Sequence, residues 1–275
     1  MLELMVDKQQ SLKEFTENHY AQASFFWNYL LKNKEIKVNG KKISADQTVY
    51  KGDYVSYFLT KKQEEKAAFY IVYEDENILV ADKEDGVNSE AVFAALSREA
   101  AGKGEERYFI HRIDRNTKGL LIFAKNSLAE SALLTAFKTH TVGKVYHALC
   151  FGAPIKDSAV MTAYLKKNAQ GALVKVYDQP TNGAEKIVTE YRVLEKFAET
   201  TKLEVCLHTG KTHQIRAHFA HIGCPLVGDM KYGITIKNKA LNMTRQCLVA
   251  KRLCVEAGDV LGYLSGKEFV SRFDV

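Results

Sequence analysis

Apolar and polar residues alternate along much of the chain after residue 67, which is the pattern of half-buried β-strands. The clearest strand-like runs are FYIVYED, NILVADK, GLLIFAK, KVYHALCFG, TEYRVLEKF and KLEVCLHT, and in GLLIFAK the apolar residues LLIFA are continuous, as in a buried strand. Strand signals dominate over helix signals in this part of the chain. The pattern therefore predicts an α+β fold with a mainly antiparallel mixed sheet and helices set to one side of it.

One helix is predicted between the third and fourth of these runs, in SLAESALLTAFKTH. Ser127 and Glu130 have the spacing of a capping box, which opens a helix. Leu133, Leu134 and Phe137 then follow at helical spacing. We expect these three side chains to face inward.

The first sixty residues have a different pattern. Apolar residues between Ser11 and Leu31 are spaced as in two short helices, and Asn39-Gly40 in IKVNGKKI is a strong hairpin signal. A second turn at Gly52-Asp53 precedes the alternating strand YVSYF. We predict a small α/β module over residues 1–62, a linker over 63–67 that overlaps the charged, non-periodic stretch KKQEEK (Lys61 to Lys66), and a larger domain over 68–275.

Composition narrows the class of protein only modestly. A chain of 275 residues with 46% hydrophobic residues can bury a sizeable core, and its net charge of +6 is compatible with a polyanionic partner. There is no apolar run of about 18 residues, and MLELMVDKQQ lacks the features of a signal peptide. We therefore expect a cytoplasmic protein that does not enter membranes. The five scattered cysteines form no CxxC pair and are expected to be reduced.

The first cluster of candidate chemistry is HRIDRNTKGLLIFAKN, from His111 to Asn126. A polar loop that leads into an apolar strand is a common place for active-site residues. Asp114 lies between Arg112 and Arg115, which favour its ionised form if either is close in space. The alternative is a surface loop held by ion pairs.

Two further clusters follow. In KVYHALCFG, Tyr146 comes 32 residues after Asp114, far enough for a strand and a returning helix to bring the two side chains together, although such a tyrosine can also pack on a sheet. In LHTGKTHQIRAHFAHIGCPLVGDMKYG, a core-facing helical stripe is expected, with His213 and Arg216 on a neighbouring face. The stripe consists of Ile215, Phe219 and Ile222. The turn-forming residues after it predict a loop near the site.

The third cluster also contains four histidines, His208, His213, His218 and His221. They invite a metal interpretation, and hence a metal-dependent hydrolase as a rival function. No HExxH pair or third carboxylate ligand accompanies them. Ordinary hydrogen-bonded histidines are favoured, and we predict no metal.

In order and spacing, the three clusters resemble the signature segments of RluA-type pseudouridine synthases, from about Ile71 to Gly233. The resemblance implies a catalytic domain of the pseudouridine synthase fold and an isomerase that converts uridine in RNA to pseudouridine. Nothing enters or leaves in this reaction, so no cofactor is expected. One departure is Lys83-Glu84, where the family has a lysine-proline pair.

The resemblance also implies roles for individual residues. Asp114 is expected to be the essential carboxylate, as nucleophile or as base, and Arg216 to pair with it. Tyr146 is expected to take the proton from carbon 5 of the turned uracil, for which it needs a buried, electropositive setting. Arg112 is expected to fill the space of the flipped nucleotide. Further RNA or base contacts are expected from His111, Arg115, Lys144, Lys211, His213 and Gln214.

The stretch from Ile36 to Val55 (IKVNGKKISADQTVYKGDYV) resembles the small alpha-L RNA-binding domain. The module has ten lysines and seven acidic residues, a modest basic excess. We expect a monomer that acts on structured RNA, with ribosomal RNA of the large subunit favoured over transfer RNA. The rival from another class is a catalytically silent RNA-binding or ribosome assembly factor that keeps the fold.

Overall fold

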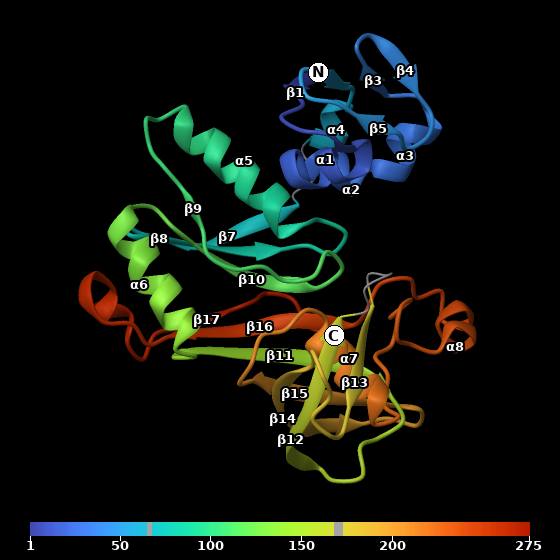
Figure 1. Cartoon of the computed structure of the whole chain (residues 1–275), viewed down its shortest axis with the longest axis vertical. Helices are drawn as coiled ribbons and strands as arrows, with labels where there is room; N and C mark the ends of the chain where they lie inside the picture. The colour runs from blue at the N-terminus through green and yellow to red at the C-terminus, as the bar shows by residue number, and fades with distance from the viewer. Residues whose placement is uncertain (65–67, 168–172) are drawn as a thin grey trace.

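A computed structural model describes residues 1–64, 68–167 and 173–275 of the chain (Figure 1). Its N-terminal part, at the top of Figure 1, combines short helices with two small sheets. The elements are β1 (Leu2–Met5), β2 (Gln10–Ser11), α1 (Leu12–His19), α2 (Ala21–Phe25), α3 (Trp27–Lys32), β3 (Ile36–Val38), β4 (Lys41–Ile43), β5 (Thr48–Val49), β6 (Tyr54–Tyr57) and α4 (Lys61–Glu64).

The predicted hairpin of this part is confirmed. β3 and β4 pair antiparallel, and Asn39 and Gly40 both have positive φ between them, as a tight hairpin turn requires. The sheet order is β1-β6-β3-β4, and β2 pairs with β5. Strand β1 and a third short helix were not predicted. The predicted linker, residues 63–67, begins inside α4, and residues 65–67 lie outside the described residues.

The larger part of the chain is built around one long sheet. Its elements are β7 (Phe69–Glu74), β8 (Ile78–Lys83), α5 (Ser89–Ala101), β9 (Tyr108–Phe109), β10 (Lys118–Ala124), α6 (Ser127–Lys138), β11 (Val142–Phe151), β12 (Ser158–Lys167), β13 (Val174–Tyr177), β14 (Glu185–Lys196), β15 (Thr200–Leu207), α7 (Gln214–His221), α8 (Thr235–Ala240), β16 (Leu248–Val255), the 3-10 helix η1 (Asp259–Leu264) and β17 (Glu268–Val270). No helix within the described residues is long and apolar enough to cross a membrane.

The long sheet is mixed and mainly antiparallel, as predicted. Its order is β13-β12-β14-β15-β11-β16-β10-β8-β7, with β9 beside β10 and β17 beside β16. β10 and β16 form the parallel pair among the strand pairs of the described residues. β16 therefore lies between β10 and β11, although β10 and β11 follow one another in the sequence (Figure 1).

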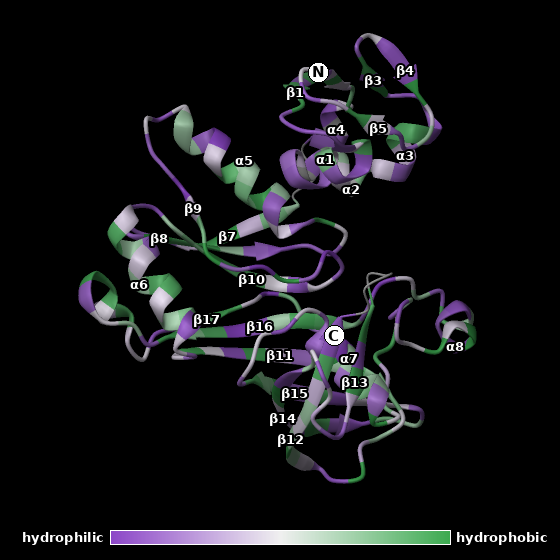
Figure 2. Ribbon diagram, viewed as in Figure 1, coloured by the Kyte–Doolittle hydropathy of each residue, from purple (hydrophilic) through white to green (hydrophobic). Residues whose placement is uncertain are grey.

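Helices cover both faces of the β8–β10 region, so the prediction of helices on one side is wrong. Leu79 and Leu121 pack with α5 on one face, whereas Ile78 and Ile122 pack with α6 and η1 on the other. The strands in this region are buried on both faces and are almost continuously apolar. Figure 2 shows hydrophobic stretches along the sheet strands and in α5 and α6, whereas β4 is mainly hydrophilic.

Helix α6 begins one residue earlier than the capping-box pattern predicts. Its N-cap is Asn126, whose side-chain oxygen accepts a hydrogen bond from the backbone N–H of Ala129 at 2.9 Å. Leu133 is fully buried and Phe137 packs on the core, but Leu134 is 45% exposed, so its predicted inward position is wrong. Asn and Ser are equally good N-cap residues, and their adjacency here made the start ambiguous.

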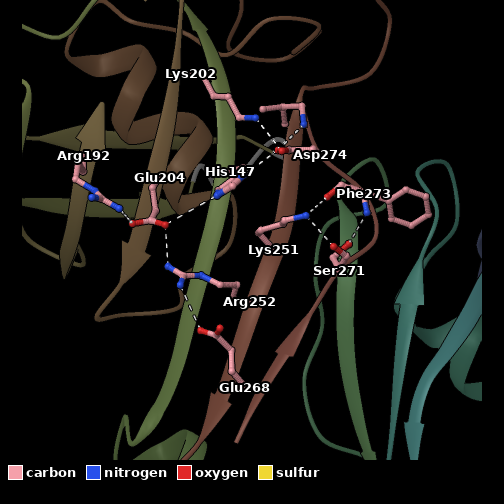
Figure 3. A network of polar contacts seen from close by, with 11 residues as sticks. His147, Arg192, Lys202, Glu204, Lys251, Arg252, Glu268, Ser271, Phe273 and Asp274 are labelled. Carbon is pink, nitrogen blue, oxygen red and sulfur yellow. Dashed lines mark hydrogen bonds and ion pairs between the residues drawn. The ribbon is translucent and has the colours of Figure 1, made fainter. Parts of the chain in front are cut away.

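Charged side chains bond the last residues of the described chain to the strands of the long sheet (Figure 3). Asp274 accepts hydrogen bonds from His147 on β11 and from Lys202 on β15, each at 2.8 Å. Lys251 on β16 donates to the backbone oxygens of Ser271 and Phe273. His147 and Tyr146 are neighbours on one strand and point to opposite faces, so this polar network lies behind the face that Tyr146 occupies.

Gly119 is the position where the parallel pair approaches most closely. Its φ is +111°, and an added Cβ would lie 2.3 Å from the backbone oxygen of Ala250. We expect Gly119→Ala to lower the free energy of unfolding by roughly 3 kcal/mol or more, through overpacking and backbone strain together. Gly104 also has positive φ, but a Cβ added there would meet nothing within 4 Å, so Gly104→Ala should cost only about 1–2 kcal/mol.

Urea denaturation of both variants separates the two causes. Equal losses at Gly119 and Gly104 would show that conformation alone, and not the contact with β16, makes glycine necessary.

Candidate active site

Asp114 lies in the loop between β9 and β10, and the backbone on either side of it is held in place. The hydroxyl of Ser89, at the start of α5, bonds both the N–H and the oxygen of Ile113. The N–H of Thr117 donates to the backbone oxygen of Asp114 at 3.0 Å. The loop therefore presents the Asp114 carboxylate from a fixed backbone.

A buried lysine, Lys83, bonds the backbone of this loop. Lys83, at the end of β8, is fully buried, and its ammonium donates to the backbone oxygens of Glu84, Val87 and Arg115 at 2.8–3.1 Å. Burial lowers the pKa of Lys83 to about 7. The Lys83-Glu84 pair, which departs from the family pattern, therefore still joins two loops beneath the site.

Arg216 connects Asp114 to a second carboxylate. Its Nη1 donates to Asp114 Oδ2 at 2.8 Å, as predicted for this pair. Its Nε and Nη2 donate to the two oxygens of Asp229 at 2.7 and 2.9 Å, a bidentate pair. Asp229 is fully buried and also accepts the N–H groups of Lys231 and Tyr232.

The pKa values agree with a permanently charged network. Burial alone would lower the pKa of Arg216, but its bonds to Asp229 and the charges of Asp229 and Asp114 outweigh burial and raise it. Burial likewise acts to raise the pKa of Asp229, and the bonds and charge of Arg216 outweigh it and lower the pKa. Arg216 and Asp229 are therefore charged at neutral pH, and one guanidinium N–H pair is left for Asp114.

Asp114 and Arg216 line a cavity of about 790 Å³. The cavity lies between the Asp114 loop, β11, the start of α7 and helix α1. All ten residues singled out from the sequence line it: His111, Arg112, Asp114, Arg115, Lys144, Tyr146, Lys211, His213, Gln214 and Arg216. A cavity of this size can hold a nucleotide-sized ligand.

Tyr146 lines the cavity from β11 and packs against apolar residues of two core clusters. Burial, and then the negative charge of Asp114, raise the pKa of its phenol far above the ordinary value. The tyrosine is therefore a neutral phenol at neutral pH. The setting is buried as predicted, but the charge that acts on the phenol is the negative charge of Asp114, so the electropositive setting is not found in the unliganded site.

His111 and Gln214 use their polar atoms within the protein. The Nε2 of His111 accepts the backbone N–H of Ile122 at 3.1 Å, and burial lowers the pKa of His111 to about 3. The amide of Gln214 is buried and bonds Thr209, the N–H of Lys211, Val188 and Thr189. Both side chains hold the cavity wall in shape.

The cationic residues of the cavity differ in how they are paired. Arg112 is 67% exposed and pairs with Glu90 at 2.7 Å, whereas Lys211 pairs with Glu185. Arg115 pairs with Glu17 on α1. Lys144 lies over the ring of Phe137, and its pKa is lowered by burial. No acidic partner of Lys144 is found among the described residues.

His213 closes the site beside Arg216. It precedes α7 with left-handed backbone, φ 56°, and its Nδ1 bonds the hydroxyl of Tyr232 at 2.9 Å. Its Nε2 lies 3.9 Å from Asp114 Oδ2. Burial lowers the pKa of His213, so the ring is neutral at neutral pH. The ring orientation is thus set by Tyr232, from the loop that the turn-rich segment predicted near the site.

The histidine cluster of the third motif does not converge on one point. His208 bonds Glu190, His213 bonds Tyr232, His218 bonds Thr189 and His221 bonds Asp178. Within the described residues, no group of three or more His, Cys, Asp or Glu side chains could hold a metal ion. These contacts match ordinary hydrogen-bonded histidines.

Comparison with known proteins identifies the family. Residues 30–221 match the family model described as RNA pseudouridylate synthase. The chain belongs to the RNA pseudouridylate synthase family. It is of the RluA type, and members of this type are isomerases that act on RNA.

Several curated members of the RNA pseudouridylate synthase family resemble the chain over most of its length. Ribosomal large subunit pseudouridine synthase D of Buchnera aphidicola is 30% identical over 81% of this chain and 77% of its own. Ribosomal large subunit pseudouridine synthase C of Vibrio cholerae is 33% identical over 74% of this chain and 70% of its own. An uncharacterised RNA pseudouridine synthase of Bacillus subtilis, YlyB, is 31% identical over 86% and 81%.

Solved structures agree on the fold. The human RNA pseudouridylate synthase domain containing 1 has a TM-score of 0.59 at 23% identity, over 74% of this chain and 88% of that one. The human RNA pseudouridylate synthase domain containing 4 has a TM-score of 0.56 at 23% identity, over 66% and 82%. At this identity, the likeness supports the pseudouridine synthase fold.

Two residues that shape the site were not predicted from the sequence. Asp229 orients Arg216, and Lys13 of the N-terminal part lines the cavity. Asp229 lies in the turn-rich segment GCPLVGDMKYG, which was predicted to pass near the site. No sequence pattern indicates that Asp229 pairs with Arg216. Lys13 carried no signal, because its place depends on how α1 packs.

We expect Asp229→Asn to impair both stability and turnover. The change leaves a buried guanidinium without its bidentate carboxylate, which should lower the free energy of unfolding by about 3–5 kcal/mol. Arg216 would lose its fixed orientation, and kcat should fall about 100-fold with a smaller change in KM. Urea denaturation and steady-state kinetics on RNA measure the two effects.

Asp178→Asn is the matched control, because Asp178 is exposed and pairs with His221 at 2.8 Å. It should change stability by no more than about 0.5 kcal/mol. Unchanged kcat in Asp229→Asn would contradict the orienting role.

Stability should fall in mild acid because of His111. Its pKa is depressed to about 3 in the fold, against an ordinary value of 6.5, so the unfolded chain takes up the proton first. This contribution is fully present above pH 6.5 and is lost as pH falls toward 3, by about 2 kcal/mol at pH 5. His111→Gln should flatten this part of the profile, measured by urea denaturation at pH 7 and pH 5. An unaltered profile would mean that His111 already titrates normally in the fold.

Proposed function

We propose that this enzyme isomerises specific uridines in structured RNA, with ribosomal RNA of the large subunit favoured over transfer RNA, and that Asp114 is its essential carboxylate. The observation that carries the proposal is the Asp114 carboxylate held by Arg216 at 2.8 Å on the wall of a cavity of about 790 Å³. Family membership supplies the reaction. The substrate preference rests on the names of the curated relatives from Buchnera and Vibrio.

Asp114 is proposed to act as the nucleophile or the base of the reaction. The reaction breaks the bond from the ribose to a ring nitrogen, turns the base, and joins the ribose to carbon 5. An ionised carboxylate can act as a nucleophile at the sugar or as a base at its 2′ position. The charge-assisted bond from Arg216 fixes the position of the Asp114 carboxylate. Arg216 occupies one carboxylate oxygen, Oδ2, and leaves Oδ1 for the substrate.

Tyr146 is proposed to take the proton from carbon 5 in the last step. Its phenol is neutral in the unliganded site, partly because Asp114 is negative. If Asp114 is the nucleophile, joining the ribose to carbon 5 breaks the ester bond between Asp114 and the sugar and restores the carboxylate before carbon 5 loses its proton. The neutral phenol of Tyr146 must then give its own proton to ring nitrogen 1 of the base, directly or through water, as its oxygen takes the proton from carbon 5.

Arg112 is proposed to replace the flipped uridine in the RNA stack. Its side chain is exposed and paired with Glu90 at the edge of the cavity. An exposed pair of this kind contributes at most about 1 kcal/mol, so RNA can displace Glu90 at small cost. Lys144 and Lys211 are proposed to bind phosphates of the same RNA.

The test is a pseudouridine map of total cellular RNA. We expect defined sites to vanish both in a deletion strain and in a strain carrying Asp114→Asn, because the amide keeps the shape of Asp114 but cannot act as nucleophile or base. The control is Asp157→Asn, which alters an exposed carboxylate paired with Lys196 and should leave the map intact.

The location of the lost sites decides the substrate. Sites in ribosomal RNA of the large subunit support the preference proposed above, and sites confined to transfer RNA would replace it. A map that Asp114→Asn leaves unchanged, with deletion also without effect and the native protein expressed, would overturn the catalytic proposal in favour of a silent RNA-binding factor.

A further inference from the structure

Helix α1 of the N-terminal part lies against the entrance of the active site. It packs on α5, whose first residue, Ser89, holds the Asp114 loop. Two of its side chains, Lys13 and Glu17, one helical turn apart, line the same cavity as Asp114. Part of the cavity wall is therefore built by a segment about 100 residues away from Asp114 in the sequence.

Glu17 fastens α1 to the catalytic loop. One of its oxygens pairs with Arg115, the residue after Asp114, and the other accepts from Asn88 at 3.5 Å. The same Arg115 donates its Nε to the backbone oxygen of Gly86 at 3.0 Å and its Nη2 to that of Ser24 at 3.4 Å. Arg115 is thus bonded at once to α1, to α2 and to the loop beneath the site.

A second contact lies outside the cavity. Arg98 near the end of α5 donates to the backbone oxygen of His19, at the C-terminus of α1, at 2.8 Å. The carboxyl end of a helix carries partial negative charge, which suits a guanidinium. Two arginines therefore fasten α1: Arg115 bonds the side chain of Glu17, and Arg98 bonds the backbone oxygen of His19.

Lys13 differs from the two arginines and from Lys211 in the rim of paired charges around the cavity. Arg112, Arg115 and Lys211 each pair with a carboxylate. Within the described residues, the ammonium of Lys13 has neither an ion-pair nor a hydrogen-bond partner, although its backbone N–H bonds Asp46. Glu17 on the same helix is already neutralised by Arg115. Lys13 is therefore the positive charge of α1 that remains available to an anionic ligand.

We propose that α1 is a fixed wall of the active site, fastened by Glu17, and that Lys13 binds a phosphate of the substrate RNA beside the reacting uridine. The inference rests on the proposed function for the identity of the substrate. It makes the N-terminal part a determinant of which RNA enters the site, in addition to any contact that its lysine-rich hairpin makes with RNA.

The first test measures binding of an in vitro transcript of large-subunit ribosomal RNA, a probe that does not depend on the result of the pseudouridine map. Lys13→Gln should weaken the Kd about tenfold and reduce the slope of log Kd against log salt by about 0.7–0.9, the share of one phosphate contact. Lys13→Arg should restore most of the affinity. Lys103→Gln is the matched charge control, because Lys103 is exposed, pairs with Glu99 and lies outside the cavity.

The second test concerns the fastening of α1. Glu17→Gln and Arg98→Gln should each raise the radius of gyration in small-angle X-ray scattering, because α1 loses a contact with the catalytic loop or with α5. Arg98→Gln changes no cavity residue, so it reports on the fastening alone. In either background, Lys13→Gln should cost much less than tenfold in Kd, because Lys13 is no longer held at the cavity.

The outcomes separate this inference from the proposed function. Wild-type conversion of the transcript, with Lys13→Gln indistinguishable from Lys103→Gln in Kd and salt slope, would overturn the inference and leave the function intact. Binding that depends on Lys13 and on Glu17, without any conversion by the wild type, would overturn the proposed function and leave the contact standing. An effect of Lys13→Gln that is equal in the Glu17→Gln background would refute the fixed wall.

Discussion

The site depends on one guanidinium shared between two carboxylates. Arg216 gives two of its N–H groups to Asp229 and a third to Asp114. Removing charges from water is costly unless each finds partners, and here the buried member, Asp229, has four. The buried pair fixes the direction of Arg216, and Arg216 then fixes Asp114. The geometry of the proposed catalytic carboxylate is thus set by a charge pair that solvent hardly reaches.

This arrangement explains the irregular backbone around it. His213 adopts left-handed φ so that α7 starts where Arg216 can reach both carboxylates, and the loop after α7 turns its N–H groups toward Asp229. Tyr232, from that loop, sets the ring of His213. Strained or irregular backbone persists where its surroundings hold it, and such positions concentrate at functional sites.

Much of the fold was predictable because sheet strands carry their burial in the sequence. Strand-like runs located most of the sheet, the spacing of 32 residues allowed Asp114 and Tyr146 to meet, and the family resemblance predicted that Arg216 pairs with Asp114. Helix placement failed, because strands buried on both faces no longer show which face a helix covers. The side-chain partners of His111 and Gln214 were also beyond the sequence. The sequence does not show whether a polar residue in a motif bonds RNA or the backbone of its own protein.

Charge in the cavity is divided between groups that the protein already neutralises and groups that it leaves for RNA. Arg112, Arg115 and Lys211 have carboxylate partners, whereas Lys13 and Lys144 have no acidic partner among the described residues. A polyanionic ligand can therefore bind Lys13 and Lys144 directly, whereas it must displace a carboxylate to bind Arg112, Arg115 or Lys211.

The position of β16 has a consequence for the order of folding. It lies between β10, which follows the Asp114 loop, and β11, which carries Tyr146, and it is made more than 100 residues after either strand begins. Pairings so distant in sequence form late, and chains acquire structure from the N-terminus during synthesis. The sheet therefore joins the two halves of the proposed active site, the Asp114 loop and Tyr146, only after β16 has been synthesised.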